Sequence, residues 1–595
     1  MSRVARTRVL WSFRGIDLFF LAVFLLIGVF HMATVRTADS YGPDSSLYLG
    51  LAHNIIHAGT YEFNFQKHAI FPPGFPALLA ALSLVGGEGY AALSRFMPVF
   101  STLGVMVWYL VLRSMEGRMV AGMACLLGAT SLALFREVTQ TILSDASFFL
   151  FSGVTLLFYA NLERKGQSTP RRVLFLVCAC LAMATTILIR SAGISLCVAF
   201  LLTAAAGIWR RPSNGFAKRR YALAAGAAGL AAYACWTGWV KRVHDEIPDS
   251  RDQSSYASQV LLADPRQPEL GRASAGQLFL RVFTLIPVQA SHLAAIATRI
   301  PYVVPAWYSP LVFTLFALLA GGVLSWLRRG DIPVPVWYFT AYFGMFMIWP
   351  FDEGQRFMWP AAPLALAIAS RGLRGALREA RTRPVTAFAV LAAIAVTLTI
   401  LAACSERLPG AQAVASRFFW PLLTAISVFL MIATKRMGPA AAGGLVRSAQ
   451  QMLRQYRVGL LAAGLLAAAG LFQQSVEARA NRTADSSKFR HSASADLAAW
   501  LRTADDGAVM AQQYAIVHRL SGRKIIGFPL TSDPVSLREA LLRGKARYLA
   551  VNDTLPYEYV IPTEEDRWKQ LDAAYPHLLQ LVQKGAGYRV FAVRP

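Results

Sequence analysis

Long apolar segments recur along this chain and set the first limit on its fold. A segment of about 17–25 mainly apolar residues can cross the roughly 30 Å hydrocarbon core of a bilayer. In lipid only helices and closed barrels satisfy their backbone hydrogen bonds. We therefore expect a polytopic α-helical membrane protein with about thirteen spans, near residues 15–35, 91–112, 119–136, 142–161, 172–189, 193–209, 221–240, 306–327, 334–351, 357–373, 385–404, 416–434 and 458–474.

The formal net charge of +26 has two explanations. In a soluble protein it would suggest nucleic acid, whereas in a membrane protein it can mark the cytoplasmic loops. With a cytoplasmic N-terminus and alternating sides, most acids fall outside, whereas the inside segments hold 27 Lys and Arg against four acids, at residues 3–14, 113–118, 163–172, 210–220, 328–331, 371–383 and 435–457. This separation predicts a multi-pass protein of the inner (plasma) membrane, with its C-terminus on the extracytoplasmic side and no nucleic-acid partner.

The C-terminal region differs in composition from the rest of the chain. We assign residues 1–474 to a membrane domain with outer loops at 36–90 and 241–305, and residues 475–595 to an extracytoplasmic (periplasmic) domain. Short strands alternate with helices in this second part, which is typical of a small α/β domain. We expect helices at 493–502, 515–520, 536–542 and 563–583, and strands at 508–512, 524–528, 546–552 and 588–593. The tail has no glycine-rich phosphate loop, so it is not predicted to bind a nucleotide.

The first outer loop contains the most informative residues. Asp44 precedes a segment, residues 45–58, that is expected to form an amphipathic helix in the membrane interface. Its polar face carries His53, Asn54 and His57. A second apolar stretch, too short to span, follows at residues 77–85.

Six short motifs in this order resemble the GT-C class of membrane glycosyltransferases, which use sugars carried on polyprenyl phosphate. The resemblance is to the group with protein O-mannosyltransferases and lipid A aminoarabinose transferases. It covers most of the membrane domain and, more loosely, the tail. The matching motifs are Asp44-x-x-x-Tyr48-x-x-x-Ala52, Gly59-Thr60-Tyr61, Pro72-Pro73-Gly74-Phe75-Pro76, Leu143-Ser144-Asp145, Ile189-Arg190-Ser191-Ala192-Gly193 and Gln355-Arg356-Phe357-x-x-Pro360-x-x-Pro363.

The resemblance implies catalytic roles for two acids. The first-loop acid of that family is usually described as the catalytic base, which maps this role onto Asp44, and Asp145 matches a position that supports the active site. Either acid can instead be explained as the N-cap of the helix that follows it. Ser45 stands where the protein mannosyltransferases carry a second acid, which weakens a protein as the acceptor.

A leaving lipid phosphate needs cations, preferably a planar guanidinium. Arg356 and Arg190 are the candidates at outer span ends, with Lys67 from the first loop, although interfacial snorkelling also explains outer arginines. Tyr48 and His68 complete the candidate binding set. Of the acids beside Arg356, Asp352 and Glu353 are better explained by pairing with a cation or by loop solvation than by catalysis.

A metal ion is a weaker expectation than the carboxylate chemistry. His53 and His57 are spaced i, i+4 and can share a divalent metal ion, with His68 as a third ligand. A polar helix face explains the same spacing. No other cofactor is predicted.

The leading hypothesis is a glycosyltransferase that moves a sugar from a polyprenyl-phosphate donor to a glycolipid, glycan or protein on the outer face. A flippase for lipid-linked glycans is the first alternative, but the spans are nearly free of charge and no internal repeat is evident. A ligase for whole glycans is the second, with His244 and His292 as the nearest candidates for its catalytic histidine.

Overall fold

A computed structural model gives the structure of this chain. It describes residues 13–36, 42–163, 167–206, 212–246, 256–264, 270–299, 310–330, 332–352, 354–382, 457–483, 492–511, 513–529, 533–552 and 564–594. The predicted spans at 385–404 and 416–434 lie outside these residues.

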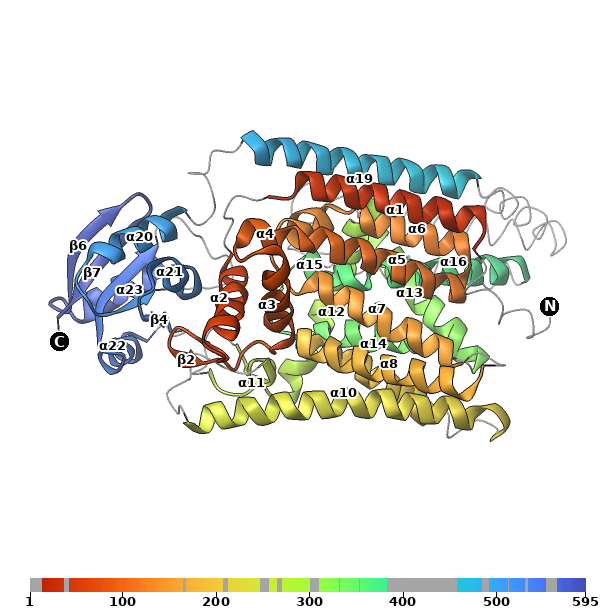
Figure 1. Ribbon diagram of the computed structural model, residues 1–595, viewed down its shortest axis with the longest axis horizontal. Helices are drawn as coiled ribbons and strands as arrows, with labels where there is room; N and C mark the ends of the chain where they lie inside the picture. Colours follow the sequence, from red (N-terminus) through yellow and green to blue (C-terminus); the bar gives the residue numbers. More distant parts are fainter. Residues whose placement is uncertain are drawn as a thin grey trace.

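Long helices form a bundle that fills most of the molecule, and a small sheet domain lies at one end of it (Figure 1). The bundle helices are α1 (Gly15–Thr34), α5 (Phe96–Glu116), α6 (Arg118–Ala129), α7 (Asp145–Leu162), α8 (Thr169–Ile189), α9 (Ile194–Ala206), α10 (Pro212–Glu246), α12 (Ala275–Thr298), α13 (Pro310–Arg329), α14 (Val334–Ile348), α16 (Ala362–Thr382) and α19 (Arg457–Thr483). Shorter helices lie between them, namely α2 (Pro43–His57), α3 (Gly74–Gly86), α4 (Tyr90–Ser94), α11 (Tyr256–Leu261) and α15 (Gln355–Met358).

Seven helices among the described residues are long and apolar enough to cross a membrane. Six of these lie where spans are predicted, within α1, α4–α5, α7, α8, α10 and α13. Four further apolar helices are shorter, at Gly74–Gly86, Arg118–Ala129, Ser191–Ala206 and Val334–Ile348. The polytopic helical fold is therefore confirmed, while the number thirteen stays a prediction.

The seventh candidate is α12, which lies in the segment assigned to the second outer loop. Hydrogen bonds near both ends of α12 connect it to the same end of the bundle. Near its start, Arg281 donates to the carbonyl of Ile348 at the end of α14, and just past its end Arg299 donates to Thr130 after α6. This helix therefore crosses the ends of α14 and α6.

Glycines allow a close approach of the helices α13 and α16. A Cβ on Gly372 of α16 would lie 1.9 Å from the carbonyl oxygen of Leu318 in α13, and one on Gly322 would lie 2.2 Å from that of Ile368. Small residues let helix backbones approach in this way where lipid gives no hydrophobic drive for association. Neither glycine has room for a side chain.

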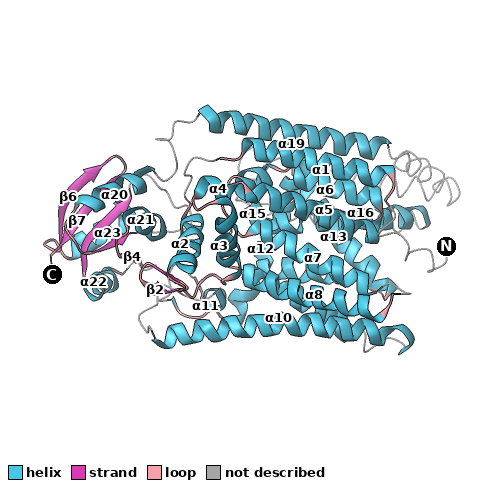
Figure 2. Cartoon of the chain, in the orientation of Figure 1, coloured by secondary structure: helices cyan, strands magenta, loops and turns pink. Residues whose placement is uncertain are grey.

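The C-terminal domain has a five-stranded sheet between two helical layers (Figure 2). The strand order is β4-β3-β5-β7-β6, with β3 parallel to β4 and β5, and the remaining pairs antiparallel. Alternate residues of the strands face α20 and α21 on one side and α22 and α23 on the other. The elements are α20 (Ser492–Thr503), β3 (Ala508–Ala511), α21 (Tyr514–Ser521), β4 (Ile525–Gly527), α22 (Pro534–Arg543), β5 (Ala546–Asn552), α23 (Glu564–Ala574), β6 (Leu579–Gly585) and β7 (Tyr588–Val593).

One predicted element of this domain is wrong in its second half. The helix expected at 563–583 ends at Ala574, and residues 579–585 form strand β6. Pro576 cannot continue the helical hydrogen bonding, and Gly587, at φ 86°, provides the turn into β7. The other predicted strands and helices of the domain are confirmed to within a few residues.

The C-terminal domain contacts the membrane domain through α2 and the short hairpin β1 (Glu62–Phe63) and β2 (Gln66–Lys67). Leu47, Leu51 and Phe63 pack against Ala515 of α21. The Asn64 side chain pairs with β4, the edge strand of the sheet, because its Oδ1 accepts from the Ile525 N–H at 2.8 Å and its amide donates to the Ile525 carbonyl. The helix α2 thus lies between the bundle and this domain (Figure 1).

Candidate active site

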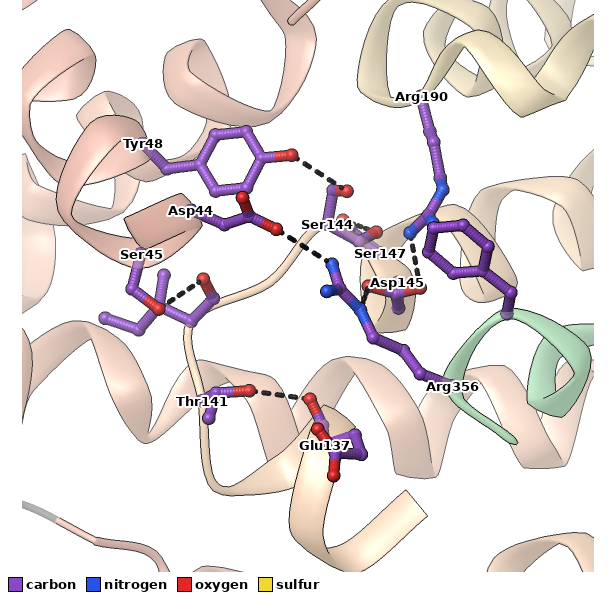
Figure 3. A network of polar contacts seen from close by, with 12 residues as sticks. Asp44, Ser45, Tyr48, Glu137, Thr141, Ser144, Asp145, Ser147, Arg190 and Arg356 are labelled. Atoms are coloured by element: carbon purple, nitrogen blue, oxygen red, sulfur yellow. Dashed lines mark hydrogen bonds and ion pairs between the residues drawn. The ribbon is translucent and has the colours of Figure 1, made fainter. Parts of the chain in front are cut away.

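Two arginines bind opposite oxygens of one buried carboxylate at the end of the bundle nearest α2 (Figure 3). Asp145, the first residue of α7, is fully buried. Its Oδ1 accepts from Arg190 Nη1 and its Oδ2 from Arg356 Nε at 3.0 Å. Arg190 is the C-cap residue that follows α8, and Arg356 lies in α15. Three segments far apart in sequence therefore meet at one carboxylate.

Asp44 extends this ion network toward the surface. Its Oδ2 accepts from Arg356 Nη2 at 3.2 Å, and its side chain is 36% exposed. The two arginine side chains are only 14% and 15% exposed. Among the described residues no protein group hydrogen-bonds the Oδ1 of Asp44. One carboxylate of the network is thus sealed, and the other faces outward.

Neither acid acts as an N-cap. The N-cap of α2 is Gly42 and that of α7 is Ser144, and neither helix has a side-chain capping bond. Asp44 and Asp145 lie instead in the first turns, where the helix dipole favours a negative charge. This geometry leaves both carboxylates to bind arginine.

The loop before α7 is held by hydrogen bonds from α2 and α4. Ser45 donates to the carbonyl of Ile142 at 3.1 Å, Tyr48 and Ser144 share a hydroxyl contact at 3.3 Å, and Tyr90 donates to the carbonyl of Gln140 at 3.0 Å. These bonds fix the backbone immediately before Asp145.

The Pro-Pro-Gly motif has a packing role near Arg190. A Cβ on Gly74 would lie 2.6 Å from the carbonyl oxygen of Leu188. The start of α3 can therefore touch the last turn of α8 only because residue 74 lacks a side chain. This contact fixes the end of the helix that presents Arg190.

An aromatic ring lies under both guanidinium groups. The centroid of Phe357 is 4.7 Å from the Arg190 guanidinium carbon and 5.6 Å from that of Arg356. Tyr342 donates a 2.7 Å hydrogen bond to the Phe357 carbonyl, which fixes this segment. Cation–π contacts of this kind orient a guanidinium without neutralising it.

Two residues of the predicted binding set are buried near the network. Tyr48 packs between Phe71 and Phe75, and burial together with the nearby Asp44 charge raises the pKa of its phenol. His68 is 2% exposed and accepts from the Phe71 N–H at 3.0 Å. Burial lowers the pKa of His68 to about 3, so its ring is neutral. Both residues support the first loop from within.

Lys67, His53 and His57 are not joined to this network by any contact among the described residues. Lys67 forms an ion pair with Glu246 at the end of α10. His53 and His57 share a carboxylate partner, Glu88. The third potential metal ligand beside them is therefore Glu88, and not His68 as predicted, because His68 is buried.

The loop before Arg356 is held by α12. His292 contacts the Asp352 carboxylate at 2.7 Å, and the same oxygen accepts from the Gly354 N–H at 2.9 Å. Gly354 has φ 67°, a conformation that favours glycine. Asp352 thus contacts a histidine and a backbone N–H, its predicted pairing with a cation stays a prediction, and Glu353 lies outside the described residues.

Phe357 and Glu88 are the residues that sequence reasoning missed. Phe357 directly follows Arg356, and its place in the Gln-Arg-Phe motif was the available signal. Glu88 stands alone between two glycines, and nothing in the sequence connects it to histidines more than thirty residues away.

Comparison with solved structures gives the fold. The chain aligns with apo ArnT of Cupriavidus metallidurans at a TM-score of 0.52 and 16% identity, over 97% of both chains. The same protein bound to undecaprenyl phosphate aligns over the same shares at a TM-score of 0.49 and 16% identity. An oligosaccharyltransferase of Archaeoglobus fulgidus, tethered to an acceptor peptide, aligns at 0.47 and 13% over 97% of this chain and 74% of its own.

At these identities the likeness to apo ArnT shows a shared fold and no more. The expected GT-C fold is therefore confirmed for this chain. No protein-family profile matches the chain, and the search of curated proteins found no match.

Proposed function

We propose that this GT-C-fold chain is an integral membrane glycosyltransferase. It moves a sugar from a polyprenyl-phosphate carrier to an acceptor hydroxyl on the extracytoplasmic face, with Asp44 as the general base. The observation that carries the proposal is the position of Asp44, the outward-facing end of an otherwise buried arginine–carboxylate network.

The Asp44 carboxylate is suited to take a proton. Arg356 holds its Oδ2, and Oδ1 has no protein donor among the residues described. A positioned carboxylate that removes the hydroxyl proton during attack typically contributes about 10²–10⁴-fold to the rate.

The bond changes then balance without a further reactant. The acceptor oxygen attacks the anomeric carbon and its proton passes to Asp44 as the new glycosidic bond forms. The bond from the anomeric carbon to the phosphate oxygen breaks, and its electron pair leaves with the polyprenyl phosphate. A single displacement of this kind inverts the configuration of the sugar.

The arginines serve the departing phosphate. Asp145 balances one of the two guanidinium charges, so Arg190 and Arg356 together retain one positive charge that Asp44 or a phosphate can balance. A lipid phosphate that binds Arg356 leaves Asp44 free to act as a base. The pair therefore links donor binding to activation of the acceptor.

The test is transfer by purified protein in lipid nanodiscs, supplied with a synthetic polyprenyl phosphate that carries a pentose or a hexose and with an outer-envelope glycolipid extract. We expect mass spectrometry to show a glycosylated acceptor. Asp44→Asn should reduce its formation by about 10²–10⁴-fold, with binding of the polyprenyl phosphate retained.

Asp506→Asn is the matched control, because that carboxylate is fully exposed on the C-terminal domain. Full activity of Asp44→Asn would overturn the assignment of the base. The flippase is tested with the protein in sealed liposomes. Movement of the intact lipid-linked sugar from one leaflet to the other, with no transfer, would support the flippase instead.

A further inference from the structure

A second cluster of ionisable side chains lies at the other end of α2, apart from the proposed reaction. His53 and His57 occupy successive turns of this helix, and Glu88 lies in the connection between α3 and α4. All three residues are exposed. They form the one group of three metal-ligating side chains found among the described residues.

Their ligand atoms already converge. His53 Nδ1 is 3.1 Å from Oε2 of Glu88, and His57 Nε2 is 2.7 Å from Oε1. The two imidazole rings lie 4.3 Å apart between centroids, and all three ligand atoms fall within 4.8 Å of one another. A tetrahedral zinc ion with bonds of about 2.0–2.1 Å would separate its ligands by roughly 3.3 Å. The present separations, between 2.7 and 4.8 Å, lie within about 1.5 Å of that value.

We propose that His53, His57 and Glu88 form a zinc site that fastens α2 to the α3–α4 connection. Two imidazoles and one carboxylate are a common zinc ligand set, and water fills the fourth position. Two neutral histidines and one carboxylate reduce the charge of the bound ion to +1. An exposed glutamate is ordinarily ionised at neutral pH, as a metal ligand requires.

The backbone around Glu88 suits a fixed ligand. Gly87 and Gly89 flank it with φ of 87° and 125°. These are conformations that favour glycine, so the connection turns sharply on both sides of Glu88. The carboxylate is thereby presented toward α2 instead of following α3.

The consequence concerns α2 as a whole. Asp44 lies nine residues before His53, which corresponds to about 13 Å along a helix. The ion would therefore lie too far from Asp44 to touch the atoms that react there. It would hold the far end of α2 and so limit rotation of the helix that carries Asp44, although the zinc site itself does not rest on the proposed reaction.

The test measures metal directly. Full-length protein with its affinity tag removed is stripped with chelator in detergent, titrated with ZnCl₂ and analysed for bound metal by mass spectrometry. We expect one zinc per chain. His57→Ala and Glu88→Gln should each weaken zinc binding at least about tenfold, because the remaining two ligands cannot complete the site.

Thermal unfolding gives a second readout that does not depend on activity. Zinc should raise the midpoint of the wild-type protein, since a ligand that binds only the folded state stabilises it, and should leave both variants unchanged. His577→Ala, which removes an exposed histidine of the C-terminal domain, is the control and should behave as wild type.

Failure of the stripped wild-type protein to bind one equivalent, or equal binding by the wild type and both variants, would overturn the site. If zinc binding is lost in the variants while transfer persists, the site stands whatever the outcome for the proposed function. Loss of transfer in Asp44→Asn with zinc retained separates the two proposals in the other direction.

Discussion

The two ends of the helical bundle carry buried ion networks built on the same plan, one aspartate between two arginines. At one end Asp17 of α1 accepts from Arg113 Nη1 and from Arg118 Nε, each at 2.8 Å. At the other end Asp145 accepts from Arg190 and Arg356. Both aspartates are fully buried.

The networks differ in how they end. Asp17 also accepts from the Tyr109 hydroxyl at 2.7 Å and from the Arg14 N–H at 2.9 Å, so protein donors surround it. The network of Asp145 continues through Arg356 to Asp44, which is 36% exposed. The closed network fastens α1 to α5 and α6, whereas the open one leaves a carboxylate partly exposed.

Asp145→Asn should break this comparison with the largest effect. It leaves two buried guanidinium groups with one anion, which typically costs about 3–5 kcal/mol of folding free energy. Transfer by the folded fraction should fall about 100-fold or more, because Arg356 loses the bond that orients it. Denaturation in mixed micelles and transfer in nanodiscs measure the two effects; normal activity would show that Asp145 does not position Arg356.

Asp17→Asn should match the stability loss without the functional loss. Removal of the charge from the closed network is expected to cost about 3–5 kcal/mol by the same reasoning. Transfer per folded molecule should stay near the wild-type rate, since Asp17 lies at the opposite end of the bundle. A selective loss of transfer would mean that the closed end takes part in function.

Arg356→Lys should separate the networks by geometry at constant charge. Lysine cannot bind Asp44 and Asp145 simultaneously through a planar fork, so kcat should fall about 10–100-fold, the loss of one charge-assisted hydrogen bond. Arg118→Lys at the closed end is the matched control, because Asp17 keeps its other donors. Equal kcat in the two variants would contradict the proposed role of Arg356.

His68→Gln should have the smallest effect. It should change the stability of the folded protein only at acidic pH. The pKa of His68 is about 3 in the folded protein and about 6.5 in the unfolded chain. The unfolded state therefore binds the extra proton between these values, and stability falls as pH drops from 6.5 toward 3, by at most about 1.4 kcal/mol per pH unit.

The variant should flatten this dependence while the pH 7 stability changes little, because the glutamine carbonyl can replace Nε2 as acceptor for the Phe71 N–H. Thermal midpoints between pH 4.5 and 7 provide the measurement. An unchanged acid slope would show that another group controls it.

Much of the fold followed from patterns with a short range in sequence. The apolar period indicated most of the described bundle helices, and alternation with turn residues indicated the strands β3, β4, β5 and β7. Strand β6 was missed because residues 579–583 continue an apolar pattern that suits a helix equally well. The helix α12 was missed because Arg281, Pro287 and His292 interrupt its apolar sequence.

The residues of the candidate site could be predicted from the sequence, but the ion pairs between them could not. Asp44, Asp145, Arg190 and Arg356 could be placed on one side from motif order and charge distribution. That Asp145 binds both arginines, that Lys67 pairs with Glu246, and that His53 and His57 meet Glu88 depends on contacts between distant segments. Side-chain pairing across the bundle has no signature in a single sequence.

The sequence by itself determined the membrane-helical class and the end of the molecule where chemistry is expected, because hydrophobic length and charge are local and additive properties. Only the tertiary structure decided which acid is sealed and which is exposed. That distinction arises when α2, α7, α8 and α15 pack around a shared volume, in which Asp145 loses all contact with water while Asp44 keeps part of its own.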